Sequence, residues 1–91
     1  MSKNFLNIFK DKTILITGGT GSFGNAVVKQ LINSEFKEIR IYSRDEKKQD
    51  DMRKNINNDK LNFILGDIRD SQQVNNALNN VDYVFHAAAL K

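Results

Sequence analysis

Three closely spaced glycines are the residues of this sequence best suited to bind a phosphate. The stretch ITGGTGSFGNAVVKQL contains Gly18, Gly21 and Gly24 as G-x-x-G-x-x-G, and Gly19, Gly21 and Gly24 equally satisfy G-x-G-x-x-G. Such glycines provide a tight turn, let the backbone approach a pyrophosphate, and allow a helix to pack closely on a strand. The free N–H groups of the helix that follows then face the anion. The stretch therefore predicts a dinucleotide-binding loop.

Two other interpretations of these glycines are weaker. Gly19 and Gly24 have the spacing of a P-loop, which needs Lys and then Ser or Thr at the next two positions to reach the β- and γ-phosphates and Mg²⁺. The sequence has Asn25 and Ala26 there, which argues against a nucleoside triphosphatase. A glycine loop can also be a plain tight turn. Here it follows an apolar strand pattern and opens an amphipathic helix pattern, which favours the dinucleotide site.

The segment YSRDEKK indicates which dinucleotide is bound. In folds that prefer NAD, a carboxylate at the end of the second strand accepts hydrogen bonds from the ribose 2′-OH. Here Ser43 occupies that end, Arg44 follows it, and Lys47 adds a second cation. A hydroxyl and a guanidinium can bind a 2′-phosphate that a carboxylate would repel, so we expect NADP. NAD stays an alternative, because Asp45 lies nearby and Arg44 could instead begin a solvated helix.

Two further stretches fit the same site. In GDIRD, Asp67 and Ile68 follow the third predicted strand, where one offers an acceptor to the adenine amino group and the other an apolar wall. In HAAA, the small side chains of Ala87 and Ala88 would let a ribose approach the backbone at the end of the fourth strand. All four residues would meet the ligand at the carboxyl ends of strands.

Short apolar runs that alternate with helical patterns must position these residues. Strands are predicted for residues 13–17, 38–43, 61–66 and 82–89. Between them we expect a helix of about four turns after the glycine loop, a charged helix anchored by Met52, and a helix capped by Asp70 or Ser71, with Gln73 completing a capping box.

This alternation predicts an α/β fold with right-handed crossovers and a parallel sheet. The architecture expected is a partial Rossmann (doubly wound) fold with strand order 3-2-1-4. In such a sheet the ligand binds at the switch point between strands 1 and 4, at their carboxyl ends. Every candidate residue above lies at that edge.

Size and composition exclude several classes of protein. The chain has 91 residues and a formal net charge of +3, with charges of both signs interspersed in residues 44–60, which is typical of a solvated helix face and not of a nucleic-acid surface. Without cysteine there are no disulfides or thiolate sites, and the lone His86 does not indicate a metal; we expect it to be a strand-end histidine with a satisfied hydrogen bond.

Residues 1–12 are predicted to form a leader that packs on the edge of the domain formed by residues 13–91. Because the leader is too short for a signal segment or a membrane span, we expect a cytoplasmic protein.

The motifs TGGTGSFG, GDIRD and HAAA together resemble those of the extended short-chain dehydrogenase/reductase superfamily. Within it, KEIRIYSRDEKKQDDMR and DYVFHAAALK are similar to the UDP-N-acetylglucosamine 4,6-dehydratases, particularly the inverting, 5-epimerising branch of bacterial capsule and O-antigen synthesis. The resemblance covers nearly the whole chain after Phe9. It implies a tightly held NADP⁺ that takes a hydride from sugar C4, loss of water across C5 and C6, and return of the hydride to C6. The product would be a 4-keto-6-deoxy sugar nucleotide.

The resemblance also implies contacts for individual residues. The residues implied to contact the pyrophosphate are Gly18, Gly21, Ser22, Phe23 and Gly24. Those implied for the 2′-phosphate are Ser43, Arg44 and Lys47, and those for the adenine are Asp67 and Ile68. Ala87, Ala88 and Lys91 would lie near the nicotinamide ribose and the entrance to the sugar site, although Lys91 could instead be an exposed chain end.

The sequence differs from this family in length. Members run to several hundred residues, and their catalytic Asp-Lys pair and Tyr- or Met-x-x-x-Lys segment lie beyond the fourth strand. Tyr42 and Tyr83 are followed at that spacing by Glu46 and Ala87 and not by Lys. We therefore expect the cofactor-binding N-terminal portion of such an enzyme, without catalytic residues, which binds NADP(H) weakly and turns over no UDP-sugar alone.

Two alternatives of different kinds stay open. One is another nucleotide-sugar epimerase or reductase of the same superfamily, and the other is a non-catalytic NADP-binding sensor module. In either case two helices would cover one sheet face and only the third helix the other. We expect the bare apolar strand surface to drive association, with further copies of the chain as the partner.

Overall fold

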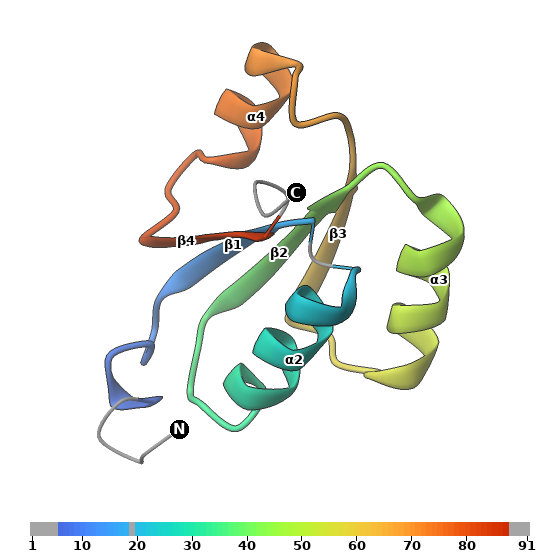
Figure 1. Cartoon of the computed structure of the whole chain (residues 1–91). Helices are drawn as coiled ribbons and strands as arrows, with labels where there is room; N and C mark the ends of the chain where they lie inside the picture. The colour runs from blue at the N-terminus through green and yellow to red at the C-terminus, as the bar shows by residue number, and fades with distance from the viewer. Residues whose placement is uncertain (1–5, 19, 88–91) are drawn as a thin grey trace.

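The computed structural model describes residues 6–18 and 20–87, which form one parallel sheet with helices on both of its faces (Figure 1). In chain order the elements are β1 (Thr13–Thr17), α2 (Ser22–Leu31), β2 (Glu38–Ser43), α3 (Glu46–Asn55), β3 (Leu61–Leu65), α4 (Ser71–Ala77) and β4 (Tyr83–His86). The four strands are hydrogen-bonded in the order β3-β2-β1-β4, and every pair is parallel. This confirms the partial Rossmann fold and the strand order expected from the sequence.

The strand register aligns the carboxyl ends of the strands at one edge of the sheet. Thr17, the last residue of β1, lies opposite Tyr42 of β2 and His86 of β4. Ser43, the last residue of β2, lies opposite Leu65 of β3. The segments that follow the strands therefore leave the sheet side by side.

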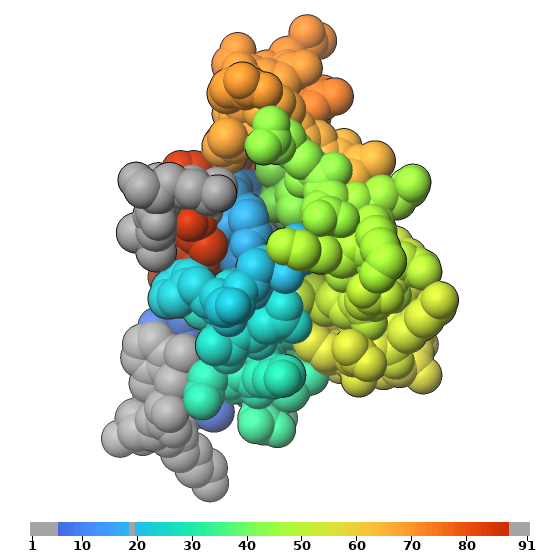
Figure 2. Space-filling model, turned by 45° about the vertical axis from the view of Figure 1, so that its right-hand side comes forward, coloured from blue at the N-terminus to red at the C-terminus, as the bar shows by residue number. Residues whose placement is uncertain are grey.

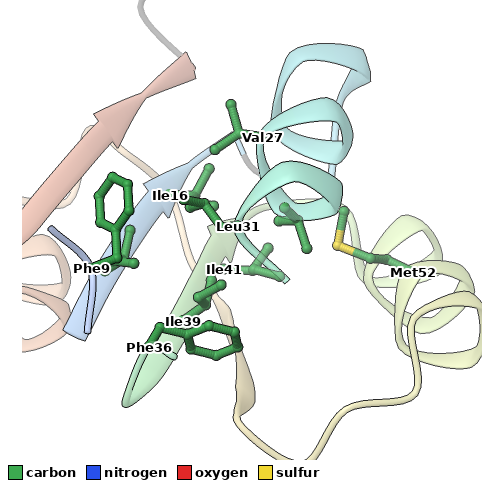
Figure 3. Close-up of a cluster of buried hydrophobic side chains, with 10 residues drawn as sticks. Phe9, Ile16, Val27, Leu31, Phe36, Ile39, Ile41 and Met52 are labelled. Carbon is green, nitrogen blue, oxygen red and sulfur yellow. The ribbon is translucent and has the colours of Figure 1, made fainter. Parts of the chain in front are cut away.

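The larger part of the hydrophobic core lies between the sheet and helices α2 and α3. Alternate side chains of β1 and β2 point to this face because successive residues of a strand face opposite sides. Figure 3 shows side chains from the two helices meeting those of the strands. The buried residues here include Ile14, Ile16, Val27, Val28, Leu31, Ile39, Ile41 and Met52. Met52 is therefore the anchor of α3, as its isolated apolar position predicts.

The predicted leader reaches the core at Phe9. This side chain is buried in the same cluster, and its ring lies edge-on to Tyr83 of β4 with the ring centroids 5.3 Å apart. Its centroid is 6.2 Å from that of Phe85. Ile8 beside it is exposed. Within the described part of the leader, one aromatic ring makes the main apolar contact with the sheet.

The opposite face of the sheet is covered by α4 (Figure 1). Leu15, Tyr42 and Ala77 are buried there. Arg40 of β2 ties the helix to the sheet, since its Nη1 donates to the carbonyl oxygens of Ala77 at 2.9 Å and Asn79 at 2.6 Å. A cation at the C-terminal end of a helix is favoured by the unpaired carbonyls there. Val84 of β4, on this face, is 48% exposed, so one short helix leaves part of the sheet bare, as expected.

Four element boundaries differ from those predicted, one of them the end of β4 at His86, which leaves Ala87 outside the strand. Helix α2 has 10 residues and not about four turns, because the backbone N–H and the hydroxyl of Ser34 both donate to the Leu31 carbonyl and end it. Strand β3 ends at Leu65 instead of residue 66. Strand β4 begins after Asp82, whose carboxylate accepts from the Thr13 N–H and whose own N–H donates to the Thr13 carbonyl, both at 2.8 Å. Of the predicted end of this strand, residues 88 and 89 lie outside the described residues.

Of the two features predicted at the start of α4, the N-cap is confirmed and the capping box is wrong. Asp70 is the N-cap residue, and its carboxylate accepts from the Gln73 N–H at 3.1 Å. Gln73 does not complete the capping box, because its side-chain oxygen lies 3.4 Å from both the Tyr42 hydroxyl and the Asp67 N–H. The Gln73 side chain therefore lies between the Tyr42 hydroxyl and the backbone N–H of Asp67, at the carboxyl end of β3.

Candidate dinucleotide-binding cleft

A cleft of about 560 Å³ opens at the carboxyl ends of the strands. Figure 2 shows residues of the blue N-terminal strand segment at the bottom of a hollow, between the cyan start of α2 and the green segment after β2. The cleft contains nine of the residues singled out from the sequence: Gly18, Gly21, Ser22, Phe23, Ser43, Arg44, Asp67, Ile68 and Ala87. Its volume lies in the range of small-molecule sites.

The glycine loop begins with a backbone conformation that favours glycine. Gly18 has φ 66°, a left-handed value that side-chain-bearing residues rarely adopt. Its N–H donates to the Tyr42 carbonyl at 2.8 Å, and its carbonyl accepts from the Gly21 N–H at 3.2 Å. Asn25 holds the far side of the loop, because its side-chain amide donates to the carbonyls of Thr20 and Gly21 at 3.1 Å each. The loop is thus fixed by its own backbone and by one asparagine.

Helix α2 begins at the cleft without a side-chain cap. Its N-cap residue is Gly21, and no acidic residue stands in the first turn. The other two helices of the described residues are each capped by an aspartate, α3 by Asp45 and α4 by Asp70. A helix N-terminus carries unpaired N–H groups and a partial positive charge, which a carboxylate normally satisfies. At α2 these groups are available to a ligand of the cleft, and Ser22 and Phe23 of this turn line it.

Gly21 leaves room in the cleft without being required by the fold. A Cβ placed on it would come no closer than 3.5 Å to the Gly18 carbonyl oxygen, which is an ordinary contact, and its φ of −77° suits any residue. Side chains as small as alanine are therefore compatible with the local structure. The space that the glycine keeps free belongs to the cleft.

At the end of β2, the Ser43 hydroxyl oxygen already accepts one hydrogen bond. The buried Gln49 of α3 donates its side-chain amide to Ser43 Oγ at 3.0 Å and to the Ile64 carbonyl at 2.9 Å. An amide nitrogen only donates, so the serine hydroxyl keeps its proton for another acceptor. A phosphate oxygen is such an acceptor, and the exposed Arg44 guanidinium lies next along the chain at the same cleft.

A carboxylate between two guanidiniums forms the opposite wall. Arg69 Nη2 donates to Asp67 Oδ2 at 2.7 Å, and Arg44 Nη1 lies 3.6 Å from the same oxygen. Hydrogen bonds from the Arg69 side chain and backbone, with the nearby charges of both arginines, hold the pKa of the Asp67 carboxyl well below its usual range. Asp67 is therefore ionised throughout the neutral range, and this wall carries a net positive charge.

The floor beside this wall is formed by Tyr42, which donates its hydroxyl to the Asp67 carbonyl at 2.7 Å. Burial, and then the negative charges of Asp70 and Asp67, raise the pKa of the phenol, so the hydroxyl stays protonated. Gly66 lies against this ring, since a Cβ on it would be 2.6 Å from the hydroxyl oxygen. The turn that carries Asp67 is thus fixed from below.

Four predicted site residues are not among those that line the cleft. Gly24 is buried in the first turn of α2. Lys47 is absent from the cleft lining, and its Nζ pairs with Asp51 at 3.3 Å along α3. Ala88 and Lys91 lie outside the described residues.

Three lining residues were missed from the sequence, Tyr42, Gly66 and Arg69. Each is adjacent to a predicted site residue, so their positions next to Ser43, Asp67 and Ile68 were the available signal. The Lys47 pairing also had a signal, because Lys47 and Asp51 have the i, i+4 spacing of a helical ion pair.

The remaining chemistry near the cleft is structural. His86 Nδ1 is 2.6 Å from the hydroxyl of Thr17, so the strand-end histidine has the hydrogen bond expected of it. Across residues 6–18 and 20–87, His, Cys, Asp and Glu side chains do not gather in groups of three or more that could hold a metal ion. In the same part of the chain, no helix is both long enough and apolar enough to span a membrane.

Comparison with known proteins gives one family match and several relatives. The sequence matches the model of the polysaccharide biosynthesis protein family over residues 14–91. It is 60% identical over 88 residues to a protein of Rickettsia prowazekii (strain Madrid E) named UDP-glucose 4-epimerase, and 59% identical over 88 residues to the protein of that name from Rickettsia typhi. Each match covers 92% of this chain and 26% of the relative. The chain therefore spans about a quarter of the length of these curated relatives.

Solved structures share the same architecture. The X-ray structure of Pen from Bacillus thuringiensis has a TM-score of 0.86 at 38% identity, covering 91% of this chain and 26% of that chain. Epimerase Mth375 from Methanothermobacter thermautotrophicus has a TM-score of 0.72 at 22% identity, covering 92% of this chain and 24% of that one, and shares the fold alone.

Proposed function

The chain belongs to the polysaccharide biosynthesis protein family, and from that membership we propose that it is the NADP-binding portion of an enzyme that modifies the sugar of a UDP-sugar. The observation that carries the proposal is the start of α2. Of the three described helices, this one lacks an aspartate cap, and it is the one whose first turn lines the cleft. A pyrophosphate would supply the negative charge that aspartates supply elsewhere.

The groups at the end of β2 support NADP over NAD. In place of a carboxylate at this strand end, the cleft has the Ser43 hydroxyl with its proton free and the Arg44 guanidinium. Both groups donate hydrogen bonds to phosphate oxygens. Asp45, the residue that could have served a ribose 2′-OH, instead caps α3 by accepting from the Lys48 N–H at 3.0 Å. We propose that Asp67 and Ile68 hold the adenine and that Ala87 lies by the nicotinamide ribose.

For the reaction of the complete enzyme we propose oxidation at C4 of the hexose. The bound dinucleotide would supply the hydride acceptor. In the 4,6-dehydratases, which the sequence resembles, water is then lost across C5 and C6 of UDP-N-acetylglucosamine. A second candidate, epimerisation at C4, is favoured by the names of the Rickettsia relatives. This portion of the chain serves both reactions alike, because its role is to hold and orient the dinucleotide.

Calorimetric titration with NADP⁺ and NAD⁺ tests the binding function. We expect NADP⁺ to bind more tightly, and Gly21→Ala to weaken NADP⁺ binding about tenfold or more, because the new methyl group occupies the cleft. The melting temperature should stay close to that of the unchanged protein. The control is Lys29→Ala, which removes an exposed cation from the last turn of the same helix and should leave binding unchanged. Absence of dinucleotide binding by the unchanged protein would refute the proposal.

The reaction is tested with a chimera in which this chain replaces the aligned quarter of the Rickettsia prowazekii relative. If the chain is a dinucleotide-binding portion of this family, the chimera should retain NADP-dependent conversion of UDP-N-acetylglucosamine or UDP-glucose, identified by NMR of the product. Arg44→Ala in the chimera should reduce that conversion. Conversion by the 91-residue chain alone would contradict the division of roles proposed here.

We also propose that the chain associates with further copies through the bare side of β4. Val84, on the face that α4 covers in part, is 48% exposed, and β4 is the edge strand of the described sheet. Exposed apolar side chains on an edge strand promote pairing between chains. Sedimentation velocity should show species larger than a monomer, and Val84→Lys should shift them toward monomer. A monomer at all concentrations would contradict this.

A further inference from the structure

Arg69 lies at the cleft and makes its strongest contacts to a single carboxylate. Its Nη2 donates to Asp67 Oδ2 at 2.7 Å, and its Nε lies 3.1 Å and 3.2 Å from the two carboxylate oxygens. The Arg69 backbone N–H also donates to Asp67 Oδ1 at 2.8 Å. Despite these contacts the side chain is 78% exposed and lines the cleft. It therefore pairs with the Asp67 carboxylate while staying accessible at the cleft.

Arg44 approaches the same carboxylate but less closely. Its Nη1 lies 3.6 Å from Asp67 Oδ2, the oxygen that Arg69 contacts at 2.7 Å. A 2′-phosphate held by Arg44 would therefore lie beside the Asp67 carboxylate, and two anions at such distances repel. Without Arg69, Asp67 would repel the phosphate and would also compete with it for Arg44.

We propose that Arg69 sets the preference for a 2′-phosphorylated dinucleotide by neutralising Asp67, which leaves Arg44 available to the phosphate. This inference rests on the proposed dinucleotide-binding function. Arg69 is a positioning residue in this scheme, because it acts through Asp67. It differs from Arg44 in a measurable way: its effect should vanish when Asp67 carries no charge.

The test measures dissociation constants for NADP⁺ and NAD⁺ in the purified protein and in four variants. Arg69→Gln should weaken NADP⁺ binding about tenfold while changing NAD⁺ binding by less than about threefold. Arg69→Lys should restore most of the preference, since it keeps the charge. The double variant Asp67→Asn, Arg69→Gln should regain the preference for NADP⁺ over NAD⁺, because the carboxylate is gone and any change at the adenine affects both dinucleotides alike. The control Arg53→Gln removes a guanidinium that pairs with Asp50 on α3 and should change neither constant.

The outcomes separate this inference from the function on which it rests. If the unchanged protein binds neither dinucleotide, the proposed function fails, and this inference fails with it. If it prefers NADP⁺ but Arg69→Gln weakens both dinucleotides equally, Arg69 is merely structural and only the inference fails. The same conclusion follows if the double variant regains no preference for NADP⁺ over NAD⁺.

Discussion

Replacing Gly66 with alanine should destabilise the protein through one buried contact under the cleft. A Cβ at this position would lie 2.6 Å from the Tyr42 hydroxyl oxygen and 2.8 Å from both Tyr42 Cζ and Gln73 Oε1. Heavy atoms do not approach a methyl group so closely, so at least one neighbour has to move. The Tyr42 ring is 1% exposed, packs with Leu15 and Ala77, and is held by its hydrogen bond to the Asp67 carbonyl.

The size of the effect follows from three contributions. Overpacking a well-filled site costs about 1–3 kcal/mol, and displacing the tyrosine hydroxyl loses a hydrogen bond of about 0.5–1.5 kcal/mol. Alanine also restricts the unfolded chain, which raises the free energy of unfolding by about 0.4–1 kcal/mol. We expect the free energy of unfolding to fall by about 2 kcal/mol, within a range of roughly 0.5–4 kcal/mol. In a chain of this length the melting temperature should drop by roughly 5–15 °C.

The measurement is urea and thermal unfolding followed by circular dichroism. The matched control is Gly21→Ala, whose Cβ meets an ordinary 3.5 Å contact. Alanine is a poorer N-cap residue than glycine, but it also restricts the unfolded chain, and these two effects nearly cancel. The free energy of unfolding of Gly21→Ala should therefore change by no more than about 0.5 kcal/mol. Tyr42→Phe removes the atom of the 2.6 Å contact, so Gly66→Ala should cost less in that background than alone.

The reasoning is refuted if Gly66→Ala unfolds at the same urea concentration as the unchanged protein. It is also refuted if the two substitutions are additive, because the contact requires them to be coupled.

Three further predictions concern the supports of the site. Gln49→Leu should lower the free energy of unfolding by about 1–3 kcal/mol and weaken NADP⁺ binding, since Ser43 loses its amide donor. Unfolding and NADP⁺ binding are measured on one preparation, and unchanged binding would contradict the proposed role of Gln49. Arg40→Met should speed hydrogen exchange in α4 and lower its stability by about 1–3 kcal/mol, because the helix loses its guanidinium contacts; unaltered exchange would oppose this. Burial would raise the pKa of Glu38, but hydrogen bonds from Arg40 and Asn62 outweigh it and lower the pKa from its ordinary 4.5. The ionised Glu38 therefore contributes fully to the free energy of unfolding above that pH, and the contribution is lost as the pH falls below it. Glu38→Gln should flatten the loss of stability in acid, and an unchanged acid transition would refute the sign.

Local signals in the sequence were sufficient for the fold and for the glycine turn beside the cleft. The strand at residues 13–17 is apolar throughout because both its faces are covered, and the structure buries all five residues. The glycine spacing predicted a turn that needs an unusual backbone, and Gly18 has it. Both signals lie within a short stretch of sequence, so they can be recognised without knowing which distant segments are in contact.

Contacts between distant segments account for what was missed. Gln49 sits among charged residues and looks solvated in the sequence, yet it is buried because its amide reaches the ends of β2 and β3. Tyr42 and Gln73 approach each other across a separation of 31 residues. Lys47 at the 2′-phosphate stays a prediction, and the structure shows its Nζ paired with Asp51, a neighbour one turn along α3. Charge alone does not give the direction in which a side chain points.

The uncapped start of α2 makes the choice of buffer an experimental variable. Inorganic phosphate and sulfate carry the negative charge that the first turn of α2 lacks. An anion that binds the folded chain but not the unfolded chain raises the melting temperature as its concentration increases. Salt is then not an inert background for this protein. A titration carried out in phosphate buffer would report competition, and affinities measured there would come out weaker than those in a buffer without multivalent anions.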